Sequence, residues 1–149
     1  MIPVRIHSDV RRITVVGAIA AAAAPAVACG DGSTAPGSPV GSYALSSVNG
    51  KPLPANVFSD TGFTVDISDG VLAVDGDGRF VMAVTSKWTV DGNLTVFASA
   101  DTGRWTQAGD TIVLTFSDSA TETGTWKGNF ITLADSTGVS ARTFLFARK

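Results

Sequence analysis

Residues 79–90 read RFVMAVTSKWTV, and the alternation within this stretch indicates the fold class. Phe80, Met82 and Trp88 occupy even positions, whereas polar residues such as Lys87 occupy odd positions. A period of two residues is that of a β-strand with one apolar face, and such strands form antiparallel sheets that cover a core on one side. The stretch therefore predicts a long strand in an antiparallel sheet.

The same alternation recurs on both sides of this stretch, and short turns separate the segments. Turns such as Asp91-Gly92-Asn93 suit tight hairpins, because glycine and asparagine tolerate a positive φ. Consecutive strands with hairpin links most simply close into an up-and-down, lipocalin-like barrel without free edges, and a two-sheet sandwich is the alternative. We expect eight strands, at residues 41–48, 63–75, 79–90, 93–107, 110–116, 121–127, 129–134 and 142–148.

The segment at residues 93–107 changes parity along its length. Leu94 and Val96 occupy even positions, whereas Trp105 is odd. A β-bulge adds one residue to a strand and so moves the following side chains to the other face. We therefore expect a bulge near residues 101–103 that brings both sets of apolar side chains to the core.

Upstream of the strands, the chain has the order of a secretory signal peptide, which we place at residues 1–28. Arg11 and Arg12 precede an apolar run over residues 13–28, and Pro25 ends any helix before the small residues at the cut. The apolar core is shorter than the roughly 20 residues that a membrane-spanning helix needs. The segment therefore predicts export rather than a permanent transmembrane anchor.

The end of the leader resembles a known processing site. The four residues Ala26-Val27-Ala28-Cys29 resemble the lipobox of bacterial lipoproteins, which are lipidated on the cysteine and then cut before it. The resemblance implies a bacterial envelope protein that acyl chains on Cys29 attach to a membrane, facing the periplasm or the exterior. The alternative is cleavage of the same bond by ordinary signal peptidase, which would release a soluble secreted protein.

Small, polar and proline-spaced residues follow the cysteine. Residues 30–41 read GDGSTAPGSPVG, a composition that behaves as a flexible tether with a span of roughly 20 Å. A tether of this length lifts a domain off a bilayer, which favours lipidation over release. We therefore interpret residues 29–40 as the lipidated cysteine and its linker, and residues 41–149 as the folded domain.

The folded domain is similar to the lipocalin-like domains of small bacterial lipoproteins. Gly41-Ser42-Tyr43 stands where lipocalins carry a Gly-x-Trp on the first strand, and Arg148 stands where they carry an arginine that packs across the ring. The resemblance implies a small closed barrel with a cation–π contact between Tyr43 and Arg148 at its seam. It also implies ligand transport as one function to consider.

The composition argues against catalysis. The single histidine, His7, precedes the cut and the single cysteine is Cys29, so the domain offers neither residue as a base, nucleophile or metal ligand. Residues 75–78, DGDG, fit a hairpin turn better than a calcium loop, because Arg79 and Ser86 stand where further ligands belong. A net charge of −2 without a basic stretch does not suit nucleic acid. We expect no enzyme activity, no metal and no cofactor.

The aromatic residues are the remaining candidates for binding. An eight-stranded barrel is either filled by its side chains or holds one small ligand. We therefore interpret the chain as a non-catalytic envelope lipoprotein whose barrel is a binding or structural module, with a carrier of a small hydrophobic ligand and a protease inhibitor as alternatives. The expected lining of any internal pocket is Phe80, Met82, Trp88, Trp105, Phe116 and Trp126.

Overall fold

The computed structural model describes residues 37–135 and 141–149. The predicted signal peptide, Cys29 and most of the linker lie outside the described residues. The described elements are all strands, and none of the described residues forms a helix long and apolar enough to cross a membrane. The strands are β1 (Gly41–Val48), β2 (Lys51–Pro52), β3 (Ala55–Asp60), β4 (Phe63–Val74), β5 (Arg79–Val90), β6 (Asn93–Ala108), β7 (Thr111–Phe116), β8 (Thr121–Lys127), β9 (Phe130–Asp135) and β10 (Arg142–Arg148).

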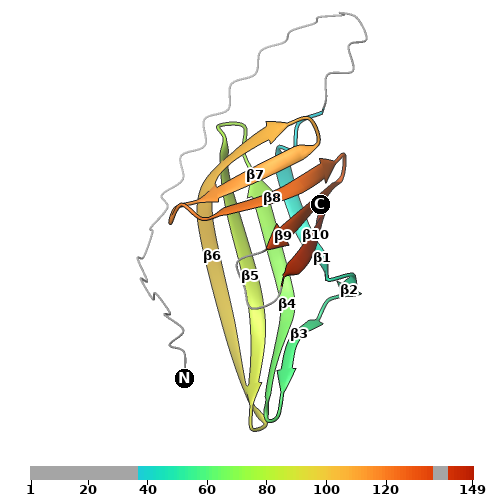
Figure 1. Ribbon diagram of the computed structural model, residues 1–149, viewed down its shortest axis with the longest axis vertical. Helices are drawn as coiled ribbons and strands as arrows, with labels where there is room; N and C mark the ends of the chain where they lie inside the picture. Colours follow the sequence, from blue (N-terminus) through green and yellow to red (C-terminus); the bar gives the residue numbers. More distant parts are fainter. Residues whose placement is uncertain (1–36, 136–140) are drawn as a thin grey trace, which may run out of the picture. The chain divides into compact units, whose positions relative to one another are not determined.

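The strands form one antiparallel sheet that closes on itself (Figure 1). From β3 to β10, strands that are consecutive in the chain pair with each other, and β10 then pairs with β1. β1 also pairs with β4, from Gly41 opposite Val74 to Ala44 opposite Val71, and this pairing closes an eight-stranded barrel. The predicted up-and-down barrel is therefore confirmed, and the sandwich alternative is excluded.

Two strands were not predicted from the alternation. β2 contains only two residues, and β3 reads ANVFSD with a register shift between Asn56 and Phe58. A shift of this kind interrupts the period of two on which the prediction depends. The two strands extend the sheet beyond the eight that close the barrel.

Side chains fill the closed part of the barrel. Alternate residues of the barrel strands point inward and form one cluster of buried side chains. Each large apolar side chain that is fully buried contributes about 1.5–3 kcal/mol to stability, so this cluster is the main source of the fold's stability. The largest members, all exposed by 2% or less, are Tyr43, Phe80, Phe146, Leu72, Ile112, Leu114, Ile131 and Leu133.

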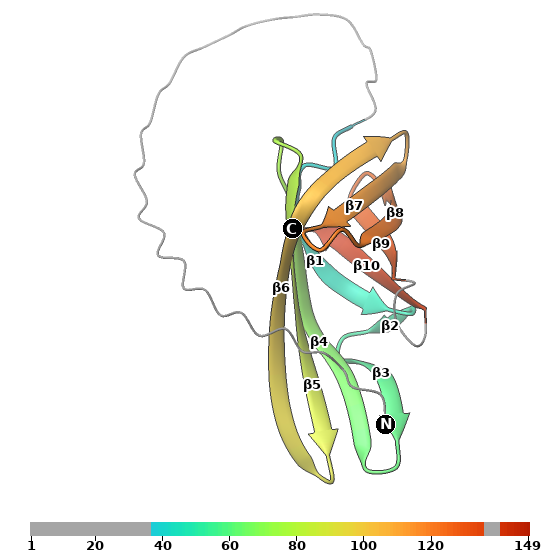
Figure 2. The ribbon, with the colours of Figure 1, turned by 60° about the vertical axis from the view of Figure 1, so that its left-hand side comes forward.

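An open sheet continues beyond the barrel (Figure 2). β1 pairs with β4 only from Val71 onward, and β7 pairs with β6 only from Gly103 onward. The preceding part of β4, the end of β5 and the beginning of β6 therefore run on without the strands that close the barrel. We call this part the sheet extension; it consists of β3 and residues 63–68, 85–90 and 93–98.

The bulge predicted near residues 101–103 is wrong. β6 pairs with β5 from Asn93 to Arg104 without a register shift. Leu94 and Val96 lie on the outer face instead and are 61% and 56% exposed. The prediction failed because apolar residues mark the core side of a strand only where another layer covers that side, and no described element covers the outer face of the sheet extension.

Candidate functional site

Three of the residues predicted to line a pocket belong to the core. Phe80 and Phe116 meet edge to face, with ring centroids 5.1 Å apart, and Met82 packs against the same cluster. Phe80 is only 2% exposed, so its ring lies in the packed interior, and together with Phe116 it also borders a hollow of about 890 Å³. These side chains fill the barrel as a packed core would.

The three tryptophans lie in separate places. Trp105 donates its indole N–H to the carbonyl oxygen of Asp75 at 2.9 Å and so ties β6 to the β4–β5 turn. Trp126 is 8% exposed, and a Cβ on Gly37 would lie 2.9 Å from its ring, so the first described residues cover it. Trp88 lies in the sheet extension. The six predicted lining residues therefore do not gather around one cavity.

Tyr43 and Arg148 meet at the seam of the barrel, where the resemblance to lipocalins places them. They are directly opposite in the β1–β10 pairing, and the guanidinium carbon lies 5.2 Å from the ring centroid. Arg148 Nη2 donates to the Tyr43 hydroxyl at 2.8 Å, and that hydroxyl donates to the Pro39 carbonyl at 2.7 Å. Pro39 is fully buried, so the end of the predicted linker at residues 29–40 packs on the barrel.

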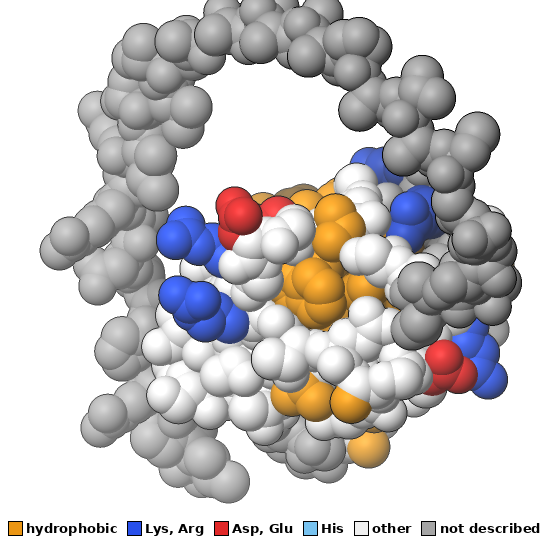
Figure 3. Space-filling model, turned by 90° about the horizontal axis from the view of Figure 1, so that it is seen from above, with side chains coloured by type: hydrophobic (Ala, Val, Ile, Leu, Met, Phe, Trp, Pro, Cys, Tyr) orange, Lys and Arg blue, Asp and Glu red, His pale blue; other side chains and the backbone are white. Residues whose placement is uncertain are grey.

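The end of the barrel next to this seam carries charge around its rim. Seen from this end, basic side chains stand at the rim and hydrophobic side chains reach the surface between them (Figure 3). The residues that precede β1 join the barrel here (Figure 1). The tips of the sheet extension lie at the opposite end.

A row of four aromatic rings crosses the sheet extension. The centroids of Phe58 and Phe63 are 5.5 Å apart, those of Phe63 and Trp88 are 5.6 Å apart, and those of Trp88 and Phe97 are 4.9 Å apart. Trp88 is an even number of positions from the buried Phe80 in β5, so both side chains lie on the same side of the strand. The row therefore continues the inner face of the barrel. Phe58 and Phe97 are 42% and 44% exposed. The row is therefore exposed to solvent, although it lies on the same side of the sheet as the buried core of the barrel.

β6 also presents a free edge, which we define as residues 93–101. Within residues 37–135 and 141–149, this segment pairs with β5 on one side and with no strand on the other. Leu94 and Val96 cover its outer face, and Phe97 lies on its inner face. Residues 93–100 read NLTVFASA and carry no charge. Folded proteins usually protect such an edge with lysine, proline or a covering element, so this strand is suited to pairing with another chain.

Glu122 is a partly buried carboxyl on the inner wall of the barrel. It is opposite the fully buried Leu114 in the β7–β8 pairing and adjoins a hollow of about 280 Å³ that Asp101 also lines. Burial, followed by the charges of Asp135 and Asp101, raises the pKa of Glu122 to about 7. Its Oε2 atom accepts no hydrogen bond from the described residues. Sequence reasoning missed this group because composition does not show which carboxylates face inward.

The raised pKa makes a prediction about stability. Because the folded-state pKa of about 7 exceeds the ordinary value of 4.5, the folded protein retains a proton that the unfolded chain releases. The stabilisation is therefore complete below about pH 4.5 and is lost as the pH rises through 7. Glu122→Gln should raise the free energy of unfolding at pH 8 by about 1 kcal/mol, an amount reduced for the partial exposure of the group. Urea denaturation at pH 4.5 and pH 8 measures this.

The control for this experiment is Asp110→Asn, which removes an exposed carboxylate from the β6–β7 turn. We expect the control to keep the wild-type pH dependence, whereas Glu122→Gln flattens it between pH 4.5 and 7. Equal slopes in all three proteins would contradict the assignment of the raised pKa to Glu122.

The fold and its surfaces define a closed eight-stranded antiparallel barrel with a packed interior and an open sheet extension. The chain matches no protein-family model, no curated protein and no solved structure.

Proposed function

We propose that this chain is a lipid-anchored, non-catalytic binding protein of a bacterial cell envelope, and that its sheet extension binds an extended segment of another envelope protein. The free edge of β6, with apolar side chains on both faces, is the observation that carries the binding role. The lipobox-like sequence that ends at Cys29 supports the anchor and the location.

The packed interior favours binding at the surface over transport. Phe80 and Phe116, which a carrier would use to line its pocket, are in contact with each other inside the barrel. A ligand of drug-like size needs a cavity of roughly 300–1,000 Å³, and the side chains of the core cluster occupy the closed part of this barrel. A carrier would have to use the hollow of about 890 Å³ that Phe80 and Phe116 border, but this hollow opens at the surface and does not enclose a ligand. No described contact favours a protease inhibitor.

Strand addition fits the chemistry of the free edge. An added strand would form main-chain hydrogen bonds with residues 93–101 and cover Leu94 and Val96 on one face. A lipid surface is a poorer occupant, because Asp60 and Asp91 place negative charge at the two hairpin tips of the sheet extension. The partner is therefore a protein segment that is extended and largely apolar.

The position of the tether favours a partner other than a second copy. Residues 37–41 and the hairpin tips lie at opposite ends of the folded unit (Figures 1 and 2). Antiparallel pairing of two β6 edges would place the two attachment ends on opposite sides of the pair. Two copies anchored in one membrane have their attachment ends on the same side, so they would not readily pair in this way. A partner that approaches from the side away from the membrane would meet the sheet extension first.

Site-specific crosslinking in cells tests this proposal. We expect a photoreactive side chain at Val96 of the full-length protein to crosslink to one other envelope protein, and the same group at Thr125 to give no such product. Thr125 is the matched control because it is an exposed, outward-facing position in β8. Products between two copies of this chain, or equal products from both positions, would contradict the proposal.

A second measurement shows whether the crosslink reports strand addition. We expect a peptide copied from the crosslinked segment to bind the purified protein, and Leu94→Lys to weaken that binding at least tenfold, because a buried lysine opposes the added strand. Leu94 is 61% exposed in the free protein, so the variant should keep the wild-type melting temperature. Unchanged peptide affinity in Leu94→Lys would rule out the free edge as the binding site.

A further inference from the structure

Arg79 and Arg104 form an unusual pair on the outer wall of the barrel. They are directly opposite in the β5–β6 pairing. Both point outward, because the neighbouring Phe80 and Trp105 point to the core. Side chains directly opposite in an antiparallel pair start from Cβ atoms about 5 Å apart, and like charges in this position destabilise a sheet.

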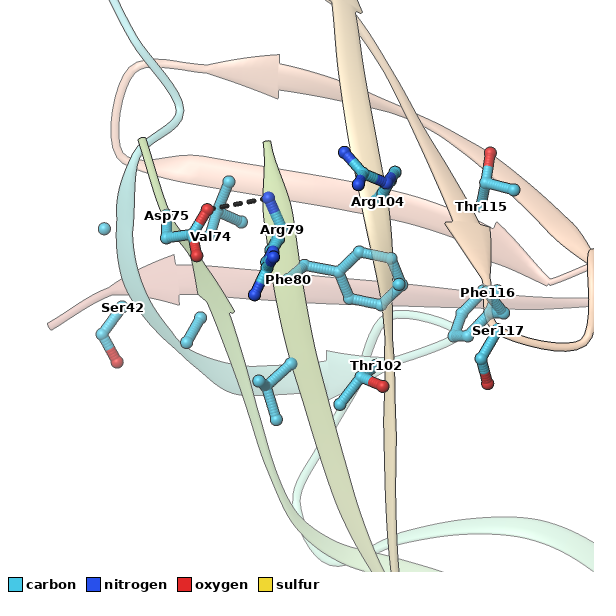
Figure 4. Close-up of a pocket in the computed structure, with 14 residues that line it drawn as sticks. Ser42, Val74, Asp75, Arg79, Phe80, Thr102, Arg104, Thr115, Phe116 and Ser117 are labelled. Atoms are coloured by element: carbon cyan, nitrogen blue, oxygen red, sulfur yellow. Dashed lines mark hydrogen bonds between the residues drawn. The ribbon is translucent and has the colours of Figure 1, made fainter. Parts of the chain in front are cut away.

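The charges of this arginine pair are only partly balanced by a carboxylate. Among residues 37–135 and 141–149, neither guanidinium forms an ion pair. Asp75 lies nearby at the end of β4, but its Oδ1 accepts the backbone N–H groups of Asp77 and Arg79, at 3.0 and 2.7 Å (Figure 4). The hydrogen bonds of this carboxylate therefore stabilise the β4–β5 turn. Asp75 keeps its negative charge and lines the same hollow as the two arginines, so the lining carries two positive charges and one negative charge, and the guanidinium groups still repel each other.

A surface hollow of about 890 Å³ adjoins the pair (Figure 4). Thr115 belongs to the same row of the outer wall, because it is directly opposite Arg104 in the β6–β7 pairing. Hydroxyl groups and guanidinium forks are the side chains that bind the oxygens of phosphate. The hydroxyl-bearing residues that line the hollow with the two arginines are Ser42, Thr102, Thr115 and Ser117.

We propose that this hollow is a binding site for a phosphate group, clamped between Arg79 and Arg104. An anion between the guanidinium groups would remove their repulsion, and the hydroxyl of Thr115, which is directly opposite Arg104, would supply a donor to a remaining oxygen. A phosphate group has more oxygens than a carboxylate, so it can meet both guanidinium groups and this hydroxyl at once. The site is independent of the sheet extension and of the protein partner proposed above.

Thermal unfolding of the purified full-length protein tests the site. At ten times the half-saturating concentration of inorganic phosphate, we expect the melting temperature to rise by about 5 °C relative to chloride at equal ionic strength. Phosphate also stabilises proteins in general by exclusion from their surface, so variants are needed to assign the effect. Arg79→Gln and Arg104→Gln should lose the specific rise, whereas Lys127→Gln, which removes an exposed charge at the end of β8, should keep it.

Two further readouts separate binding from a structural role. Without phosphate, Arg104→Gln should melt at a higher temperature than the wild type, because it removes the repulsion; a purely structural arginine would show the opposite. Arg104→Lys should retain binding but weaken it about tenfold, since lysine keeps the charge without the fork. Equal phosphate-dependent rises in the wild type, Arg79→Gln and Arg104→Gln would overturn the proposal.

The same assay identifies the source of the phosphate. Glycerophosphoglycerol, the water-soluble headgroup of phosphatidylglycerol, is compared with inorganic phosphate. Tighter binding of the headgroup would assign the site to membrane lipid, and tighter binding of inorganic phosphate would assign it to the free ion. Binding of neither compound would overturn the proposal, and neither result depends on crosslinking at Val96.

Discussion

Gly103→Ala should lower the free energy of unfolding by about 3 kcal/mol, a large part of the 5–15 kcal/mol that a domain of this size has. At Gly103, β6 leaves its free edge and begins to pair with β7. A Cβ there would overlap the carbonyl oxygen of Thr115, lie 2.7 Å from the ring of Phe80 and lie 2.9 Å from the Cα of Phe116. Two of these three atoms belong to the backbone of β7 and cannot rotate away as a side chain can, so the backbones of β6 and β7 must separate.

Urea denaturation measures this loss, and the chain offers matched comparisons. Gly124→Ala should cost a similar amount, because a Cβ there would overlap the carbonyl oxygen of Thr132 and lie 2.7 Å from Leu133. Gly76→Ala is the control, since a Cβ at Gly76 meets nothing within 4 Å, and it should change stability by no more than about 0.5 kcal/mol. If Gly103→Ala matched the control, the close approach of β6 and β7 would be wrong.

Cys29→Ser should move the protein from the membrane fraction to the soluble fraction. Acyl chains contribute about 0.8 kcal/mol per buried CH₂, so two long chains give firm attachment where one gives reversible binding. Removing the only thiol of the chain removes the proposed attachment point, and we expect the ratio of membrane-bound to soluble protein to fall at least a hundredfold. Cell fractionation with quantitative blotting measures this ratio.

Ser33→Ala, in the linker, is the control for this change and should stay in the membrane fraction. Intact-mass analysis of the wild type gives an independent result, because a lipoprotein begins at Cys29 and carries the mass of its acyl chains. An unmodified amino terminus, or a leader of residues 1–28 still attached, would contradict the anchor. Such a result would leave the fold unaffected and remove the envelope location from the proposed function.

Short-range patterns predicted most of the strands. The boundaries expected for the strand at residues 79–90 are those of β5, and the strand at residues 93–107 ends one residue before β6 does. These boundaries follow from turn residues and a period of two, both of which are properties of neighbouring residues. β3 was missed because its register shift interrupts the period.

The candidate binding residues were less accessible to sequence reasoning. Alternation along a strand shows on which side of the sheet an aromatic residue lies, but it does not show whether a second layer covers that side. Phe80 and Trp88 share a face of β5, yet one ring is buried in the barrel and the other belongs to the row that crosses the sheet extension. The arginine pair was not predicted at all, since Arg79 and Arg104 meet only through the register of β5 and β6.

By itself, the sequence determined an all-β chain of hairpin-linked strands that follow an apolar N-terminal segment and a cysteine, because alternation, turn residues and the order of residue types are local properties. Only the tertiary structure decided that β1 closes the barrel on β4, that no described strand pairs with the free edge of β6 and that Arg79 and Arg104 are directly opposite each other beside a hollow. These features depend on register between strands and on which layer covers each face. A change of one residue in register would send every side chain of a strand to its other face, so spacing along the chain cannot specify them.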